Sequence, residues 1–105
     1  MDNVDKKSEA RDQLAVLRGQ IDDIDRQLVD LFLRRMRVSD EIAGAKRRGG
    51  IGVTDRERER AVIEAARAGA GNRDRDFVAA FMQSLITLSK QRQERQNPTN
   101  GEKDL

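Results

Sequence analysis

Residues 14–48 read LAVLRGQIDDIDRQLVDLFLRRMRVSDEIAGAKRR, and the apolar residues in this stretch recur in alternating steps of three and four. That spacing lines them up along one side of an α-helix and predicts a single helix of about 35 residues, with no Pro or Gly near its middle. We call this row of residues the apolar seam. It consists of Leu14, Leu17, Ile21, Ile24, Leu28, Leu31, Val38, Ile42 and Ala45.

The predicted helix is too long for a small domain. At ~1.5 Å of rise per residue it would extend roughly 50 Å, whereas a compact domain of about 100 residues has a radius of gyration of only ~13 Å. The helix would therefore project beyond its own domain, and its apolar seam must be covered by apolar surface from elsewhere. A second copy of the chain is the simplest source of that surface.

A second, shorter helix is predicted after a glycine-rich break at residues 49–52. Thr54 with Glu57 forms a capping-box pattern, which opens this helix at about residue 55. The sequence GAGN at residues 69–72 ends it. The apolar side of this helix carries Val62, Ile63 and Ala66.

A third helix is predicted over residues 73–96, from a row of apolar residues at helical spacing. This row consists of Phe77, Val78, Phe81, Leu85 and Leu88. The predicted fold class is therefore all-α, with three helices in the order long–short–medium that dimerise through the first. The polar residues 1–11, and residues 97–105 with Pro98, are expected to be disordered tails. This leaves residues 12–96 as one domain.

The composition excludes several classes of function. Charged residues make up 38% of the 105 residues, aromatic residues 3%, and the formal net charge is only +2 with both signs interleaved. A nucleic-acid-binding protein would be expected to show a basic stripe and aromatic residues for stacking, so we expect no nucleic-acid partner. No stretch approaches the roughly 20 apolar residues of a membrane span, and the amino terminus lacks the apolar core of a secretory signal. We therefore expect a cytoplasmic protein without membrane contact.

The chain contains neither His nor Cys. These absences exclude zinc sites of the usual kinds, Ser-His triads and thiolate nucleophiles, so we expect no metal ion and no cofactor. An enzyme built from this chain would have to work with Arg, Lys, Asp, Glu, Ser and Gln. Positioning of the substrate and electrostatic stabilisation suit that set best.

Arg35 falls in the apolar seam where an apolar residue is expected, between Leu31 and Val38. A buried Arg is costly unless it is paired, so it requires an anion, which is either an acidic side chain or a ligand. An Arg that snorkels to solvent or fixes the helix register is the structural alternative. Lys46 lies three turns further along nearly the same face, ~16 Å away by helix rise, and both long side chains could reach one small anion.

Two further polar sets interrupt apolar faces. Asp55, Arg58 and Glu59 share one face of the second predicted helix, and that face continues into its apolar side. An ion-pair cluster within the helix is the structural alternative there. On the third predicted helix, Ser89 and Gln93 lie four residues apart on one face and offer uncharged donors. A helix end that faces solvent would explain them equally well. Together the three sets would suit a small polyanion that also carries hydroxyl groups.

These residues resemble the all-helical chorismate mutase family. The matching pieces are LRGQIDDIDRQLVDLFLRRM (17–36), IAGAK (42–46), DRERE (55–59) and SKQRQ (89–93), and the resemblance runs from about Leu14 to Gln93. The family rearranges chorismate to prephenate in a pericyclic reaction without nucleophile, metal or cofactor, on the route to Phe and Tyr. No fused domain is indicated, so the resemblance implies a free-standing mutase.

The resemblance also implies roles for individual residues. Arg18 and Arg35 would bind the two carboxylates of chorismate, for which guanidinium forks are well suited. Arg58 would support this cationic lining. Lys46 and Gln93 would donate hydrogen bonds to the ether oxygen, on which negative charge develops as its bond breaks.

The remaining implied roles concern the rest of the substrate. Asp55 and Glu59 would bind the ring hydroxyl and orient Lys46. Ser89 would touch a carboxylate, and Ile42 would form an apolar contact in the wall of the site.

Arg18 lies seventeen residues before Arg35, which corresponds to about 25 Å along one helix. Two residues so far apart on a straight helix cannot grip the same small molecule. If both bind substrate, Arg18 must come from a second chain, as in the intertwined homodimer of the family.

Two alternatives stay open. An isochorismate pyruvate-lyase or an aminodeoxychorismate mutase would use the same scaffold and the same carboxylate-binding residues. Asp55 and Glu59 favour chorismate itself, since those relatives lack the intact D-x-x-R-E block. The second alternative is a non-enzymatic helical dimerisation module.

Overall fold

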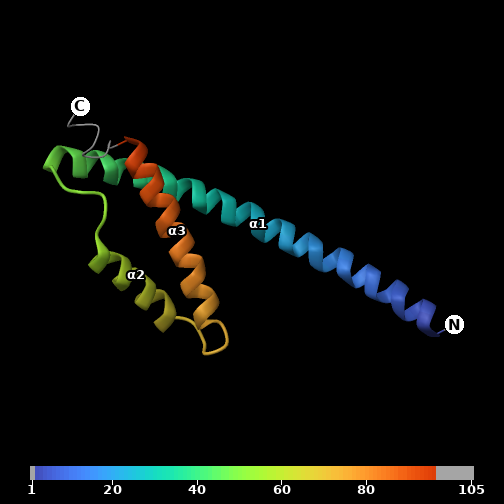
Figure 1. The fold of residues 1–105 in the computed structure, drawn as a ribbon. Helices are drawn as coiled ribbons and strands as arrows, with labels where there is room; N and C mark the ends of the chain where they lie inside the picture. Colours follow the sequence, from blue (N-terminus) through green and yellow to red (C-terminus); the bar gives the residue numbers. More distant parts are fainter. Residues whose placement is uncertain (1, 97–105) are drawn as a thin grey trace. The chain divides into compact units, whose positions relative to one another are not determined.

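The computed structural model describes residues 2–96, and these residues form three α-helices and no β-strand (Figure 1). Helix α1 spans Asp2–Gly49, α2 spans Arg56–Ala68 and α3 spans Arg75–Gln96. The prediction of an all-α fold with a long, a short and a medium helix is confirmed. The expected carboxyl-terminal tail, residues 97–105, lies outside the described residues.

Helix α1 begins earlier than the apolar periodicity predicts. Residues 2–11, which were expected to belong to a disordered tail, are helical in the structure. This segment contains no Gly or Pro, and Lys, Glu, Ala and Arg within it are good helix formers. The periodic pattern marks where a helix carries an apolar face, and it cannot detect a helical extension that carries none.

The chain divides into two compact units, Met1–Arg35 and Met36–Leu105, which we call the amino-terminal and carboxyl-terminal units. In the amino-terminal unit the described side chains up to Leu31 are exposed. The apolar seam is part of this exposed surface: Ile21 retains 58% and Ile24 retains 54% of its accessible area. No helix among residues 2–96 is long and apolar enough to cross a membrane.

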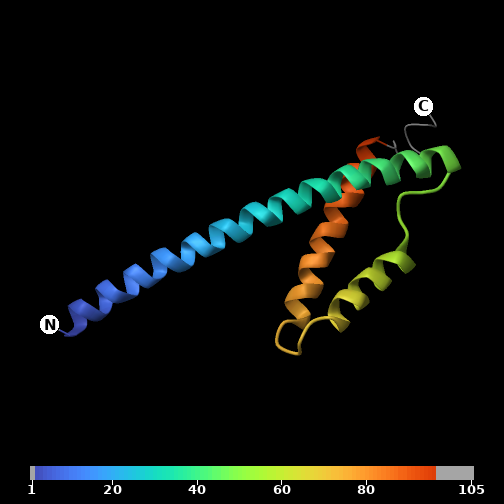
Figure 2. The same cartoon turned by 180° about the vertical axis from the view of Figure 1, so that it is seen from behind.

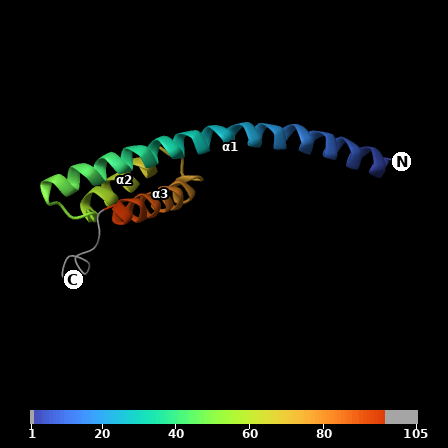
Figure 3. The same cartoon turned by 90° about the horizontal axis from the view of Figure 1, so that it is seen from above.

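In the carboxyl-terminal unit, α2 and α3 pack against each other in opposite directions, joined by the turn at residues 69–74 (Figures 1 and 2). The apolar side predicted for α2 is the side that packs, because Val62, Ile63 and Ala66 are partly buried while Glu64 and Ala65 are exposed. The carboxyl-terminal turns of α1 complete the unit, and Figure 3 shows the three helices of the chain from above.

The core of the carboxyl-terminal unit is small and unusually polar. Among the described residues, the buried apolar side chains are Ala43 and Ile86. Ser39, Ser89 and Gln93 are buried beside them. A single chain therefore buries little apolar surface, and polar side chains occupy much of what it does bury.

The break between α1 and α2 is made by glycine geometry. Gly50 adopts a left-handed backbone conformation with φ of +65°, which is favourable for glycine and strained for other residues. Its N–H donates to the carbonyl of Arg47 at 3.3 Å, and the N–H of Ile51 donates to the carbonyl of Lys46 at 2.8 Å. These two bonds satisfy carbonyls that the end of the helix would otherwise leave unpaired.

Candidate active site

The side chain of Lys46 is partly buried at the end of α1, and its Nζ donates to the carbonyl oxygen of Val53 at 2.6 Å. This bond ties the last turns of α1 to the segment that leads into α2. The accepting residue, Val53, lies two residues before Asp55 in the chain. The structure thus fixes the position of the cation that the sequence singled out.

Asp55 is the N-cap of α2, and this corrects the capping box predicted on Thr54. Asp55 has extended backbone angles, φ −135° and ψ 92°, and its Oδ1 accepts from the backbone N–H of Arg58 at 3.0 Å. Both Thr and Asp are good N-cap residues, so the sequence alone does not decide whether Thr54 or Asp55 caps the helix. The backbone angles decide it. The side chain of Arg58 itself is exposed.

Replacing Asp55 with Ala should lower the free energy of unfolding by about 1 kcal/mol, because the N–H of Arg58 loses its acceptor. Asp55→Asn should keep most of that stability, since the amide oxygen can accept the same bond. Thr54→Ala is the matched control and should change the free energy by less than about 0.5 kcal/mol. Chemical denaturation at one protein concentration measures all three. An equal loss in Thr54→Ala and Asp55→Ala would show that the cap is assigned to the wrong residue.

Glu59 forms an ion pair that the sequence did not predict. Its Oε2 lies 3.3 Å from Nζ of Lys90, which links α2 to α3. The side chains of Glu59 and Lys90 keep only 23% and 31% of their accessible area, so this ion pair is more shielded than an ordinary surface pair. The resemblance implies that Asp55 and Glu59 orient Lys46, and this stays a prediction. In the structure the Lys46 ammonium donates to the Val53 carbonyl.

Ser89 and Gln93 are each 7% exposed, so they do not form the solvent-facing helix end that was the structural alternative. The Oε1 atom of Gln93 is buried and has no hydrogen-bond partner among the described residues. A buried polar atom left unpaired costs about 1–3 kcal/mol. Such an atom in an otherwise satisfied interior indicates a group that a ligand or solvent completes.

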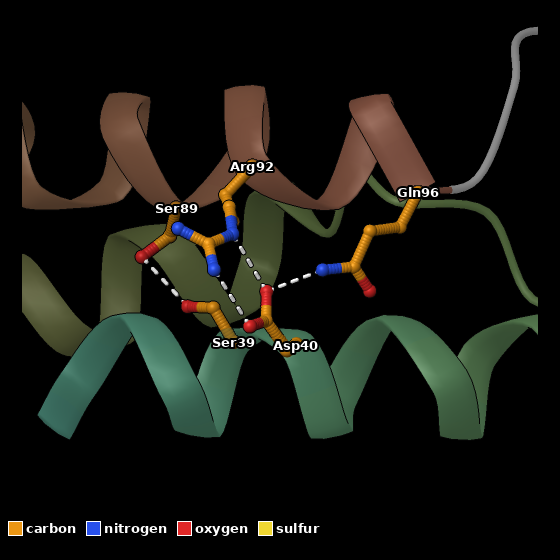
Figure 4. Close-up of polar contacts among 5 residues, drawn as sticks. All are labelled: Ser39, Asp40, Ser89, Arg92 and Gln96. Carbon is orange, nitrogen blue, oxygen red and sulfur yellow. Dashed lines mark hydrogen bonds and ion pairs between the residues drawn. The ribbon is translucent and has the colours of Figure 1, made fainter. Parts of the chain in front are cut away.

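A polar cluster missed by the sequence analysis joins α1 to α3 (Figure 4). Asp40 accepts two hydrogen bonds from Arg92, from Nε to Oδ1 and from Nη2 to Oδ2, both at 2.8 Å. Gln96 also donates to Asp40. Ser39, which directly precedes Asp40, places its Oγ 3.0 Å from Ser89 Oγ in a hydrogen bond between the two hydroxyls.

The sequence did contain a signal for this contact. Ala43 and Gly44 are small neighbouring residues one turn after the cluster, and both are buried. Small residues let two helices approach closely, which favours short polar contacts between them. The apolar seam predicts that the face of the helix with Val38 and Ile42 is the one that packs, but these two residues are 50% and 42% exposed. In the single chain, the face with Ser39 and Ala43 packs instead.

The remaining predicted residues lie in different surroundings. Arg18 is exposed, Arg35 is partly exposed, and both belong to the amino-terminal unit. Lys46, Glu59, Ser89 and Gln93 belong to the carboxyl-terminal unit and have the contacts and burial given above. No group of three His, Cys, Asp or Glu residues that could hold a metal ion occurs within residues 2–96.

Comparison with known proteins agrees with the sequence motifs. The model of the family described as chorismate mutase type II matches residues 17–94. This match covers more than half of the chain and confirms the resemblance. No curated protein and no solved structure matches the chain significantly.

Proposed function

The chain belongs to the type II chorismate mutase family, and from this membership we propose that it rearranges chorismate to prephenate in a pericyclic reaction that serves the synthesis of Phe and Tyr. The burial of Gln93 is the structural observation that carries the proposal. The residue is 7% exposed, and its acceptor atom Oε1 lacks a partner among the described residues, so a polar side chain is buried here without full hydrogen bonding from the protein. The group that donates to the ether oxygen in this proposal is the Nε2 amide group. A neutral amide can donate to an ether oxygen without changing its charge state.

The proposed mechanism relies on electrostatics and conformational restraint. Chorismate is flexible and must adopt a chair-like conformation before its ether bond breaks. Lys46 and Gln93 donate to the ether oxygen as negative charge develops there, so they bind the transition state more strongly than the substrate. The bond from Lys46 to the Val53 carbonyl supports this role, because it restricts the ammonium group before substrate arrives.

The two acidic residues bind the ring hydroxyl in this proposal. Asp55 already caps α2 through Oδ1, and its second carboxylate oxygen provides another acceptor for the substrate hydroxyl. Glu59 acts from its ion pair with Lys90. That ion pair restrains the Glu59 carboxylate. In the proposal Asp55 and Glu59 also help to orient Lys46, together with the Val53 carbonyl.

Arg18, Arg35 and Ser89 bind the two carboxylates of the substrate in the proposal, with Arg58 adding positive charge and Ile42 forming an apolar contact. Arg18 comes from the second chain of an intertwined homodimer. Exposed apolar surface in both units supports this dimer. The amino-terminal unit exposes its apolar seam, and α3 exposes Phe77 at 76% and Phe81 at 51%. Apolar surface of this extent is typical of a protein interface.

Purified protein should consume chorismate and form prephenate at a rate that changes little between pH 6 and 8. The reason is that imidazole is the side chain that ordinarily titrates in this range, and the chain has no His. The loss of chorismate absorbance, with prephenate identified as product, measures this rate. A steep bell-shaped profile near neutrality would argue against Gln93 as the ether-oxygen donor. Unchanged chorismate, with pyruvate released from isochorismate, would favour the lyase on the same scaffold.

A further inference from the structure

We propose that Lys90 is a positioning residue for the reaction, which acts by fixing the Glu59 carboxylate as the acceptor for the ring hydroxyl of the substrate. This inference rests on the proposed function. Nζ of Lys90 lies 3.3 Å from Oε2 of Glu59, and the two side chains keep 31% and 23% of their accessible area. Water therefore screens this ion pair less than it screens a fully exposed one.

Both partners of the ion pair lie among the candidate site residues of the carboxyl-terminal unit. The backbone N–H of Glu59 donates to the carbonyl of Asp55 at 3.0 Å, which places Glu59 one turn after the N-cap of α2. On α3, Lys90 directly follows Ser89 and lies three residues before Gln93, and both of these neighbours are 7% exposed. The ion pair thus joins α2 to α3 in the turns that carry the residues assigned to the substrate.

The chemistry of the two groups determines what Glu59 offers to a ligand. A carboxylate only accepts hydrogen bonds, through two oxygens with about four lone pairs, and an ammonium only donates them. The interaction therefore has a fixed direction, with Lys90 as donor and Glu59 as acceptor. One ammonium uses part of the accepting capacity of the carboxylate. What remains suits the hydrogen of a substrate hydroxyl.

The ion pair also restricts the Glu59 side chain before substrate binds. A glutamate side chain has several rotatable bonds, and ordering them upon binding costs entropy. Contact with Lys90 on a neighbouring helix meets that cost during folding, so the acceptor is already in place. Without the Lys90 cation, a carboxylate with only 23% of its area exposed would lack its counter-charge and would turn toward solvent.

A purely structural role, in which the ion pair only ties α2 to α3, is the competing explanation. The chain offers a direct comparison, because a second ion pair joins the same two helices at their other ends. Nη1 of Arg67 lies 3.3 Å from Oδ1 of Asp76, and the Arg67 side chain is 34% exposed. A structural tie of either kind affects the unfolding temperature and leaves the kinetic constants of the folded protein alone. A positioning residue also lowers kcat/KM, and it does so only while Glu59 is present.

The test compares Lys90→Met, Glu59→Ala and the double variant by steady-state kinetics on chorismate and by thermal unfolding. Lys90→Met should lower kcat/KM about 3–10-fold, the scale of one weakened hydrogen bond. Combined with Glu59→Ala, it should lower kcat/KM by less than about twofold further, because Lys90 acts through Glu59. Lys90→Arg keeps a cationic donor and should retain at least about half of the wild-type kcat/KM. The matched control is Arg67→Met, which removes the cation of the other ion pair and should leave kcat/KM at the wild-type value.

An unchanged kcat/KM in folded Lys90→Met would overturn the inference, whether or not its unfolding temperature falls. Fully additive losses in the double variant would contradict it as well, because they would show that Lys90 acts independently of Glu59. The same holds for a loss in Arg67→Met or in Lys90→Arg equal to that in Lys90→Met, since the tie between helices or the length of the side chain would then explain the effect. These results all leave the proposed function standing. A wild-type protein that does not convert chorismate overturns the proposed function and this inference together, and that result is visible before any variant is made.

Discussion

Replacement of Lys46 by Ala should lower kcat/KM for chorismate about 10²–10³-fold, the usual effect of removing one donor to charge that develops in a transition state. The ammonium of Lys46 is partly buried and already fixed by its 2.6 Å bond to the Val53 carbonyl. A preorganised cation of this kind loses little energy in reorientation as the ether bond breaks. Most of the effect should therefore appear in kcat.

Two further variants separate the charge of Lys46 from its other contributions. Lys46→Met keeps most of the length and apolar stem but removes the charge, and it should be as inactive as Lys46→Ala. Arg48→Ala removes an exposed cation from the same last turn of α1 and should keep nearly full activity. Circular dichroism should show all variants folded. Near-normal turnover in Lys46→Met would remove Lys46 from the site.

The second large effect is recovery of activity in a mixture of two inactive variants. Arg18→Ala and Lys46→Ala homodimers should each be nearly inactive. After co-refolding, one site of each mixed dimer carries both defects, and the other receives Lys46 from one chain and Arg18 from the other. Random assembly of equal amounts makes about half the dimers mixed, each with one intact site of two, so about a quarter of wild-type activity should return.

The matched control for this mixture is Gln93→Ala refolded with Lys46→Ala. Both residues lie in the carboxyl-terminal unit of one chain, so every site that lacks one of them in its own chain stays defective, and no activity should return. Light scattering and subunit exchange between labelled chains establish that mixed dimers form. If they form and the Arg18→Ala mixture remains inactive, Arg18 does not act across the interface.

The helical pattern was predictable because it depends on local spacing. Alternating steps of three and four residues define the apolar seam, and the glycines at 49–52 coincide with the observed end of α1. The amino-terminal extension of α1 was not predictable in this way, since residues 2–11 have helix-forming composition without apolar periodicity. The choice between Thr54 and Asp55 as N-cap also needed backbone angles, which neighbouring residues of similar propensity do not determine.

The sequence by itself determined the fold class and the family, and it singled out the charged and polar residues that are proposed to bind the substrate. The reason is that residue spacing and composition can be read without knowledge of the packing. The tertiary structure alone decided which polar groups meet. It buried Ser89 and Gln93, joined Ser39 to Ser89 and paired Glu59 with Lys90. Hydrogen bonds and ion pairs act over about 3 Å, and such a distance between residues fifty positions apart is set only when whole helices pack.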